Sequence, residues 1–207
     1  MIRIKNKIVK HTGKVIPLDI SNVDTDVIIP KQFLQRVTKN GFGFNLFHNW
    51  RFHDEKGEKI NKNFILNKNE YKNSTILLCR DNFGCGSSRE HAVWALKDYG
   101  FLIVIATSFA DIFYNNSINN NLLPICFNKN IINNMFNIVK KNIGIKFTVN
   151  LHKKSVTNIY QKYNFDIDET VKQRLIQGID NIDLTMKIKK KIKQYESKIP
   201  KFFLNLF

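Results

Sequence analysis

Residues 74–106 read STILLCRDNFGCGSSREHAVWALKDYGFLIVIA, and this stretch decides the fold. STILLC is a short apolar run of strand length, and SREHAVWALKDYG has the pattern of a helix that Gly100 would end. FLIVIA then indicates a second buried strand. Two such strands joined by a crossover helix form a parallel pair with a right-handed connection. The stretch therefore predicts an α/β fold, with a glycine-rich loop, DNFGCGS, between the first strand and the helix.

The flanking sequence continues this alternation of strands and helices. Upstream, a strand at residues 8–18 leads into SNVDTD, whose Asx residues form turns and caps, and a helix is expected at 31–37. Residues 41–52, GFGFNLFHNWRF, indicate no element clearly. Downstream the pattern predicts helix 108–118, strand 122–127, helix 131–141, a β-hairpin at 145–167 that turns near Lys153 and Lys154, and helices 168–179 and 181–199.

The size and composition of the chain indicate one globular domain. Its 207 residues are 43% apolar and 24% charged, which is enough to bury a substantial core. No apolar run of about 18 residues occurs, and the first residues lack the apolar segment of a secretory signal. We therefore expect a soluble, cytoplasmic protein.

The net charge of +16 comes from 33 Lys and Arg against 17 Asp and Glu. Such a balance is typical of partners of nucleic acids or anionic surfaces, but here lysine is scattered among Asn and Ile along the whole chain. One dense block lies on a predicted helix whose Ile188 and Ile192 form an apolar stripe. A solvated helix face is the favoured interpretation, and a patch for an anionic partner is the alternative. The block consists of Lys187, Lys189, Lys190, Lys191 and Lys193.

The cysteine pattern predicts neither disulfides nor a metal site in this chain. Cys79, Cys85 and Cys126 are an odd number and have no C-x-x-C spacing. Cys79 lies where a buried strand would end, and no third ligand follows locally. We expect reduced thiols and no metal-ligating residue.

The loop before the central helix has the features of an anion site. Gly84, Gly86, Ser87 and Ser88 immediately precede a predicted helix, so backbone N–H groups and the positive helix end can face a carboxylate or a phosphate. Arg89 adds a planar bidentate donor. In the alternative interpretation, Ser88 caps the helix, the glycines only make the turn and Arg89 lies on the surface. The residues alone leave both interpretations open.

Three longer strings carry a resemblance to a known family. NFGCGSSREHAVWAL at 82–96, NVDTDVIIPKQFL at 22–34 and FADIFYNNSINNNLLPI at 109–125 closely resemble the small subunits of bacterial 3-isopropylmalate dehydratases, in the aconitase superfamily. The resemblance covers nearly the whole chain and is densest at 11–127. It implies one aconitase-type swivelling domain over residues 1–207, with a mostly parallel central sheet flanked by helices. A C-terminal hairpin and helices would occupy about 145–199.

The same resemblance implies residue roles. The serine that matches Ser87 is the base, and the residues that match Ser88 and Arg89 hold a substrate carboxylate. Helix dipole, loop amides and guanidinium would stabilise a serine alkoxide, which makes this assignment physically reasonable. The departing hydroxyl needs a Lewis acid, which in this family is a 4Fe-4S cluster. Because this chain has no suitable cysteine set, a separate large subunit should hold the cluster, and this chain should be inactive alone.

For several residues beside the loop, a structural role is favoured over a catalytic one. Glu90 suits a helix N-terminus, and His91 suits a packed or hydrogen-bonding position. Cys85 is interpreted as a small apolar filler of the loop. Asp24 and Asp26 could form a catalytic carboxylate pair, but their spacing before an apolar run favours Asx turns.

The tetrapeptide at residues 33–36, Phe-Leu-Gln-Arg, matches the segment that selects the substrate side chain in this family. Phe33 and Leu34 offer an apolar surface for an isopropyl group. Relatives that act on tricarboxylates tend to place a cation near the position of Gln35, which is neutral here, although Arg36 weakens the argument. In the alternative interpretation, Phe33 and Leu34 are core residues of an amphipathic helix.

Two other functions remain as alternatives at this point. A small subunit of homoaconitase, or of another dehydratase of the superfamily, would carry the same loop. An RNA-binding module would use the positive charge, and its binding would be salt-sensitive.

Overall fold

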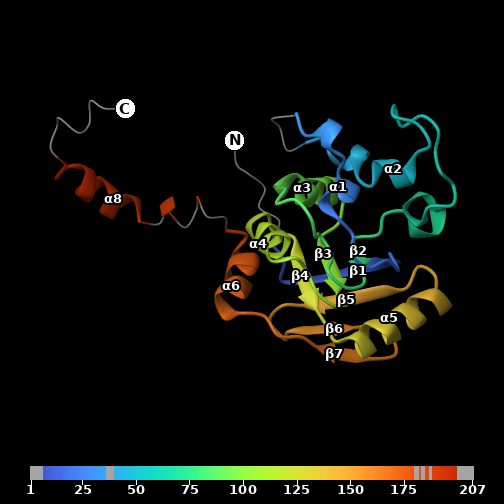
Figure 1. Ribbon diagram of the computed structural model, residues 1–207. Coiled ribbons are helices and arrows are strands. Elements are labelled where there is room, and N and C mark those ends of the chain that lie inside the picture. Colours follow the sequence, from blue (N-terminus) through green and yellow to red (C-terminus); the bar gives the residue numbers. More distant parts are fainter. Residues whose placement is uncertain (1–6, 36–39, 180–181, 183–184, 187, 200–207) are drawn as a thin grey trace.

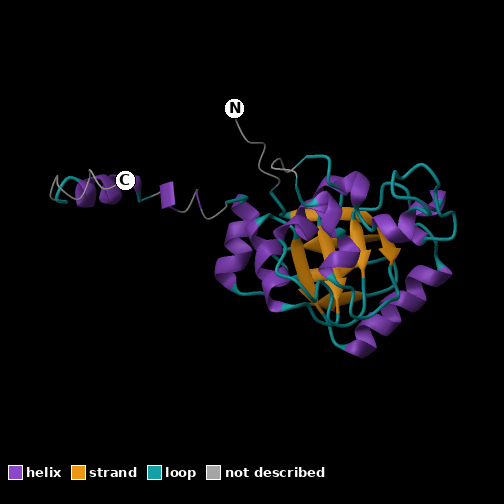
Figure 2. Ribbon diagram, turned by 45° about the horizontal axis from the view of Figure 1, so that its top comes forward, coloured by secondary structure: helices purple, strands orange, loops and turns teal. Residues whose placement is uncertain are grey.

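The computed structural model describes residues 7–35, 40–179, 182, 185–186 and 188–199. A seven-stranded sheet in the order β4-β3-β2-β1-β5-β6-β7 forms its centre. Helices lie on both faces of this sheet (Figures 1 and 2). The expected α/β class is confirmed.

Four parallel strands make up the first half of the sheet, as the sequence predicts. They are β1 (Lys10–Pro17), β2 (Ile76–Leu78), β3 (Ile103–Ala106) and β4 (Leu123–Cys126). Every residue of β2 and β3 is buried. Continuous apolar runs are typical of parallel strands covered on both faces. The crossovers between these strands carry the helices that build the candidate site.

The second half of the sheet contains the expected hairpin and extends it by one strand. Residues 145–167 form three antiparallel strands, β5 (Lys146–Asn150), β6 (Ser155–Thr157) and β7 (Lys162–Asn164), which continue the same sheet from β1. The sheet therefore has three parallel and three antiparallel pairings. The first turn is where the sequence places it, and Lys154 adopts a positive φ of 46° there. The third strand is only three residues long, which is too short for alternation to separate it from the loop.

The helices from Glu90 onward follow the predicted order, whereas the four-residue helices Thr25–Ile28 and His48–Arg51 were not predicted. The described helices are α1 (Thr25–Ile28), α2 (His48–Arg51), α3 (Glu90–Tyr99), α4 (Asp111–Asn119), α5 (Lys129–Lys141), α6 (Glu169–Gln177) and α8 (Lys189–Glu196), with 3-10 turns at Lys31–Phe33, Gly43–Asn45, Ile65–Asn67 and Asn69–Tyr71. The helix expected at 31–37 is wrong for the described part. Only one 3-10 turn forms after Pro30, because this turn already packs Phe33 and Leu34 against the core. Residues 36–37 lie outside the described residues.

Alternate strand residues divide the core into two layers. Ile103 and Ile105 of β3 belong to the cluster that includes Met135 of α5, whereas Val104 belongs to the cluster that includes Leu96 of α3. This alternation follows from the two-residue period of a strand. The layer with α3 supports the glycine-rich loop.

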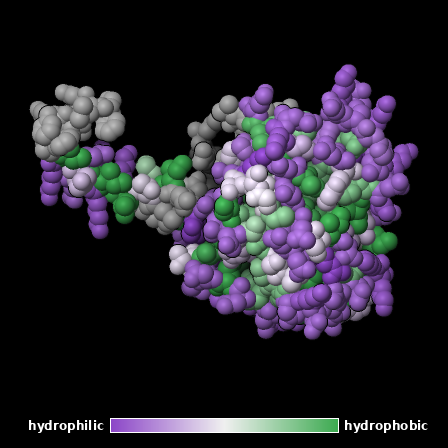
Figure 3. Space-filling model, viewed as in Figure 1, coloured by the Kyte–Doolittle hydropathy of each residue, from purple (hydrophilic) through white to green (hydrophobic). Residues whose placement is uncertain are grey.

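The lysine-bearing helix α8 projects away from the body of the molecule (Figure 1). All of its described lysines are exposed, which agrees with a solvated helix face; Lys187 lies outside the described residues. The body also presents a largely hydrophilic surface with hydrophobic patches (Figure 3). Among the residues that the structure describes, no helix has the length and apolar character needed to cross a membrane.

Candidate functional site

The glycine-rich loop between β2 and α3 is held on both sides by backbone hydrogen bonds. On one side, Gly84 N–H donates to the carbonyl of Val23 at 2.8 Å, and Thr25 N–H donates to the carbonyl of Cys85 at 2.8 Å. On the other side, Phe83 N–H donates to the carbonyl of Ser108, and Ala110 N–H donates to that of Phe83, both at 3.1 Å. The segments that precede α1 and α4 therefore fix the position of the loop.

The hydroxyl of Thr25 adds a further contact to this arrangement. Thr25 is buried, and its Oγ1 donates to the carbonyl of Ser87 at 2.8 Å. The side chain of Ser87 itself is exposed. The backbone at Ser87 is thus held while its hydroxyl stays accessible.

Both loop glycines have backbone conformations that L side chains rarely adopt. Gly84 has φ of 78° and Gly86 has φ of 83°. A Cβ on Gly84 would lie 2.2 Å from Cγ of Phe113, and one on Gly86 would lie 2.1 Å from Oδ2 of Asp24. Close approach, as well as turn formation, therefore requires glycine at both positions.

Gly86→Ala is expected to destabilise the protein more than Gly144→Ala does. Both glycines have φ of 83°, so both variants carry the same backbone strain of about 1 kcal/mol. Only Gly86 has a neighbour in the way, since a Cβ on Gly144 meets nothing within 4 Å. The check is the urea midpoint of each variant against wild type. Equal shifts for the two variants would show that the contact with Asp24 imposes no cost.

The N-terminus of α3 faces the loop without a side-chain cap. Arg89 is the N-cap residue and makes no capping side-chain hydrogen bond, and its N–H donates to the carbonyl of Ser87 at 2.7 Å. Ser88 therefore does not cap the helix, and that alternative interpretation is wrong. Arg89 lies one position before the first turn rather than within it. Glu90 is the first-turn acid that the sequence predicts.

Ser87, Ser88 and Arg89 come together on one cleft with a volume of about 250 Å³. The polar loop forms part of its lining, and the start of α4 forms another part. The cleft is lined by Thr25, Gly84, Gly86, Ser87, Ser88, Arg89, Ala110, Asp111, Ile112 and Phe113.

An ion pair that the sequence did not reveal joins Arg89 to Asp26. Nη1 of Arg89 contacts Oδ1 of Asp26, and the two side chains are 16% and 36% exposed. Nη2 of Arg89 lies 3.5 Å from Oγ of Ser87. Lys31 is a second cation near Asp26, with Nζ 3.8 Å from Oδ2. One edge of the guanidinium is thus engaged by Asp26, and the other is directed to the serine.

Asp24 has the role that its sequence position predicts. Its Oδ1 accepts a hydrogen bond from the backbone N–H of Asp26 at 2.6 Å and so caps α1. The prediction of an Asx turn is confirmed for Asp24. For Asp26 it is incomplete, because this carboxylate pairs across the chain with Arg89.

The remaining residues of the motif serve packing. The His91 ring lies against Phe42 and Trp94, with centroids 5.4 and 4.5 Å away, and burial lowers its pKa. Oε1 of Glu90 accepts a hydrogen bond from Asn120 at 2.6 Å. Desolvation, and secondarily Asp24, raise the pKa of the Cys85 thiol. The contacts of His91 and Glu90 agree with their structural interpretation, and that of Cys85 stays a prediction.

The described residues of the expected specificity segment, 33–35, do not line the cleft. Phe33 packs on His48 at a centroid distance of 4.8 Å, and Phe33 and Leu34 are half-buried against the core. Gln35 is exposed, and Arg36 lies outside the described residues. Residues 33–35 are therefore not brought together with Ser87 on this cleft.

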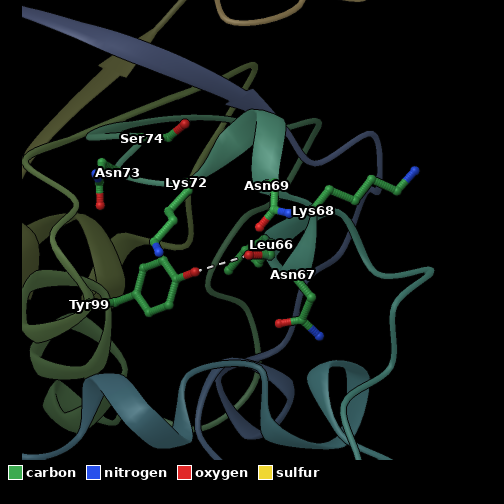
Figure 4. Close-up of a pocket in the computed structure, with 8 residues that line it drawn as sticks. All are labelled: Leu66, Asn67, Lys68, Asn69, Lys72, Asn73, Ser74 and Tyr99. Carbon is green, nitrogen blue, oxygen red and sulfur yellow. Dashed lines mark hydrogen bonds between the residues drawn. The ribbon is translucent and has the colours of Figure 1, made fainter.

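A larger cleft of about 380 Å³ lies elsewhere and contains none of the predicted site residues (Figure 4). It is formed around Tyr99, whose hydroxyl donates to the carbonyl of Leu66 at 3.2 Å. Its lining consists mainly of amide and lysine side chains. The smaller cleft, where a hydroxyl, a guanidinium and a helix N-terminus meet, is the better candidate for chemistry.

The described residues offer no ligand set for a metal or an iron–sulfur cluster. Within residues 7–35, 40–179 and the described part of the C-terminus, no group of three or more His, Cys, Asp or Glu side chains could hold an ion. The three cysteines are separate free thiols, and burial raises the pKa of Cys79 well above its usual value. No iron ligand is therefore assigned among the side chains that the structure describes.

Comparisons with known proteins agree on one relationship. Residues 5–130 match the model of the aconitase C-terminal domain. The 3-isopropylmalate dehydratase small subunit of Buchnera aphidicola subsp. Baizongia pistaciae (strain Bp) is 57% identical over 197 residues, which cover 95% of this chain and 98% of that protein. The protein of the same name from Buchnera aphidicola subsp. Acyrthosiphon pisum (strain APS) is 58% identical over 198 residues, or 96% of each chain.

A solved structure also resembles this chain. The crystal structure of a 3-isopropylmalate dehydratase from Methanocaldococcus jannaschii superposes with a TM-score of 0.64 and 26% identity. The match covers 91% of this chain and 99% of the archaeal one.

Proposed function

The chain belongs to the family of 3-isopropylmalate dehydratase small subunits, and on that premise we propose that the cleft beside Ser87 is its share of the active site. The enzyme is a hydro-lyase of leucine biosynthesis. It interconverts 2-isopropylmalate and 3-isopropylmalate through 2-isopropylmaleate, by removal and return of water. We also propose that residues 1–207 form one swivelling domain.

In this proposal Ser87 is the base. Its alkoxide takes the proton from the carbon next to a substrate carboxylate and returns a proton there in the reverse direction. A serine hydroxyl is a weak base unless the alkoxide is stabilised. The observation that carries the proposal is the position of Ser87 at the uncapped N-terminus of α3, with Nη2 of Arg89 3.5 Å from its Oγ. Both features favour negative charge on the serine oxygen.

Ser88 and Arg89 bind a substrate carboxylate in the same proposal. Ser88 is exposed on the cleft and does not cap α3, so its hydroxyl is available to a ligand. Proton abstraction next to a carboxylate creates a second negative charge, and the loop amides around Gly86 would stabilise it. The carboxylate would approach the edge of the guanidinium that Asp26 does not engage.

A large subunit completes the site. The cleft of about 250 Å³ is smaller than the roughly 300–1,000 Å³ of typical ligand pockets, which supports a half-site that a partner closes. We propose that the large subunit binds the 4Fe-4S cluster that the family implies, since the described part of this chain offers no ligand set for it. The cluster would supply the Lewis acid for hydroxyl departure. A cytoplasmic location is part of the same proposal.

Reconstitution tests this function directly. The tagged chain is purified with and without its cluster-loaded large subunit, and turnover is measured on 2-isopropylmalate and on a homoaconitate-type substrate. Activity on isopropylmalate by the complex alone is the expected result. Preference for the tricarboxylate would identify a homoaconitase subunit instead, and salt-sensitive RNA binding by the free chain would favour an RNA-binding module.

We propose further that Phe33, Leu34 and Gln35 help to select the isopropyl group once the partner is bound. Gln35→Arg is expected to shift kcat/KM toward a substrate with a third carboxylate, because a placed guanidinium offsets the cost of burying that carboxylate. Gln32→Arg is the control. Gln32 is also exposed, and this substitution adds the same charge three residues earlier. A change in the substrate ratio below about threefold, or an equal change in the control, would contradict this role.

A further inference from the structure

An exposed isoleucine stands on the candidate cleft. Ile112 is 50% exposed, although isoleucine is among the residue types most often buried. It lies in the first turn of α4 and lines the cleft together with Ala110 and Phe113. The start of α4 therefore gives an apolar side to a cleft whose loop is polar.

The start of α4 is rigidly connected to the glycine-rich loop. Phe113 is buried and packs edge-on against Phe83, with ring centroids 5.2 Å apart. The hydrogen bond from Ala110 to Phe83 joins the two backbones directly. Phe113 also occupies the space that a side chain at Gly84 would need. These contacts hold the backbone at the start of α4 beside the loop, and Ile112 lies on that turn.

The charges on the cleft are arranged unevenly. Arg89 and the N-terminus of α3 attract anions on the loop side. Asp111, the neighbour of Ile112, is exposed and negative and offsets the positive N-terminus of α4, so the start of α4 attracts a carboxylate less than the loop side does. A dicarboxylate with one alkyl branch would therefore place one of its carboxylates against Arg89 and its alkyl group against Ile112.

We propose that Ile112 is a specificity-determining residue that contacts the branched alkyl group of the substrate. The inference rests on the proposed function, because it requires the substrate to occupy this cleft. Burial of an alkyl branch against an exposed isoleucine removes apolar surface of both partners from water. Loss of a single methylene contact in an apolar pocket typically changes kcat/KM by about 10- to 200-fold.

The test compares two substrates that differ only in the alkyl group. Ile112→Ala and Ile112→Val are each reconstituted with the cluster-loaded large subunit, and kcat/KM is measured for 3-isopropylmalate and for 3-methylmalate. We expect Ile112→Ala to lower the isopropyl value at least tenfold and the methyl value less than threefold, with Ile112→Val in between. Ile143→Ala is the control, since Ile143 is 61% exposed and does not line the cleft.

The other outcomes separate this inference from the proposed function. If kcat/KM for both substrates decreases by the same factor, Ile112 does not select the alkyl group. A weaker complex in a pull-down would then show that Ile112 contacts the large subunit instead. An unchanged ratio in both variants would also overturn the inference. A wild-type complex without activity on isopropylmalate would remove the proposed function itself, and the inference with it.

Discussion

Replacement of Ser87 by alanine is expected to lower kcat of the reconstituted enzyme by about 100- to 10,000-fold, which is the usual contribution of a general base. KM should change little, because the proposed carboxylate contacts of Ser88 and Arg89 remain. Folding and partner binding should also persist, since the hydroxyl of Ser87 is exposed and the loop is held through backbone groups. The measurements are steady-state kinetics, a urea unfolding curve and co-purification with the large subunit.

A serine outside the cleft is the control for this variant. Ser21→Ala removes an equally exposed hydroxyl from the loop before α1 and should leave kcat unchanged. Near-normal turnover of Ser87→Ala would remove Ser87 from the mechanism. A loss of partner binding that accounts for the whole decrease in activity would instead make the residue part of the interface.

The parallel half of the fold could be predicted because its signals are local. STILLC and FLIVIA are apolar runs of strand length, and Gly100 ends the helix between them with a positive φ of 118°. The glycine-rich loop could be placed before the helix for the same reason. In contrast, the segment at Lys31–Phe33 forms a single 3-10 turn although its short apolar pattern suits a helix, because a pattern over so few residues does not determine the helix type.

Features of the site that depend on distant contacts could not be predicted. Asp26 and Arg89 are 63 residues apart, and nothing in the spacing of Asp24 and Asp26 indicates that only one of them would meet a guanidinium. The exposure of Ile112 could not be predicted either, because a short amphipathic pattern predicts a helix but not which apolar residue stays exposed. The sequence predicted which residues could do chemistry, and the structure supplied which of them face one cleft.

The ion pair of Arg89 leads to the second large expected effect. Arg89→Lys should raise KM about 10- to 100-fold, since hydrogen bonds to charged groups contribute roughly 1.5–3 kcal/mol each. A lysine keeps the positive charge and can still pair with Asp26. It cannot, however, hold Asp26 with one edge and present a second edge toward Ser87 and a substrate carboxylate. Arg89→Lys should therefore weaken substrate binding more than it lowers the free energy of unfolding.

Arg80→Lys is the matched control for this variant. Arg80 is 21% exposed and pairs with Asp19, as Arg89 is 16% exposed and pairs with Asp26, but Arg80 does not line the cleft. Its guanidinium also lies 4.0 Å from the centroid of the Phe136 ring, so Arg80→Lys should lower stability while KM stays unchanged. The two variants are compared by KM for 3-isopropylmalate and by urea midpoint. If Arg89→Lys behaves as Arg80→Lys does, the guanidinium of Arg89 supports the loop and binds no substrate carboxylate.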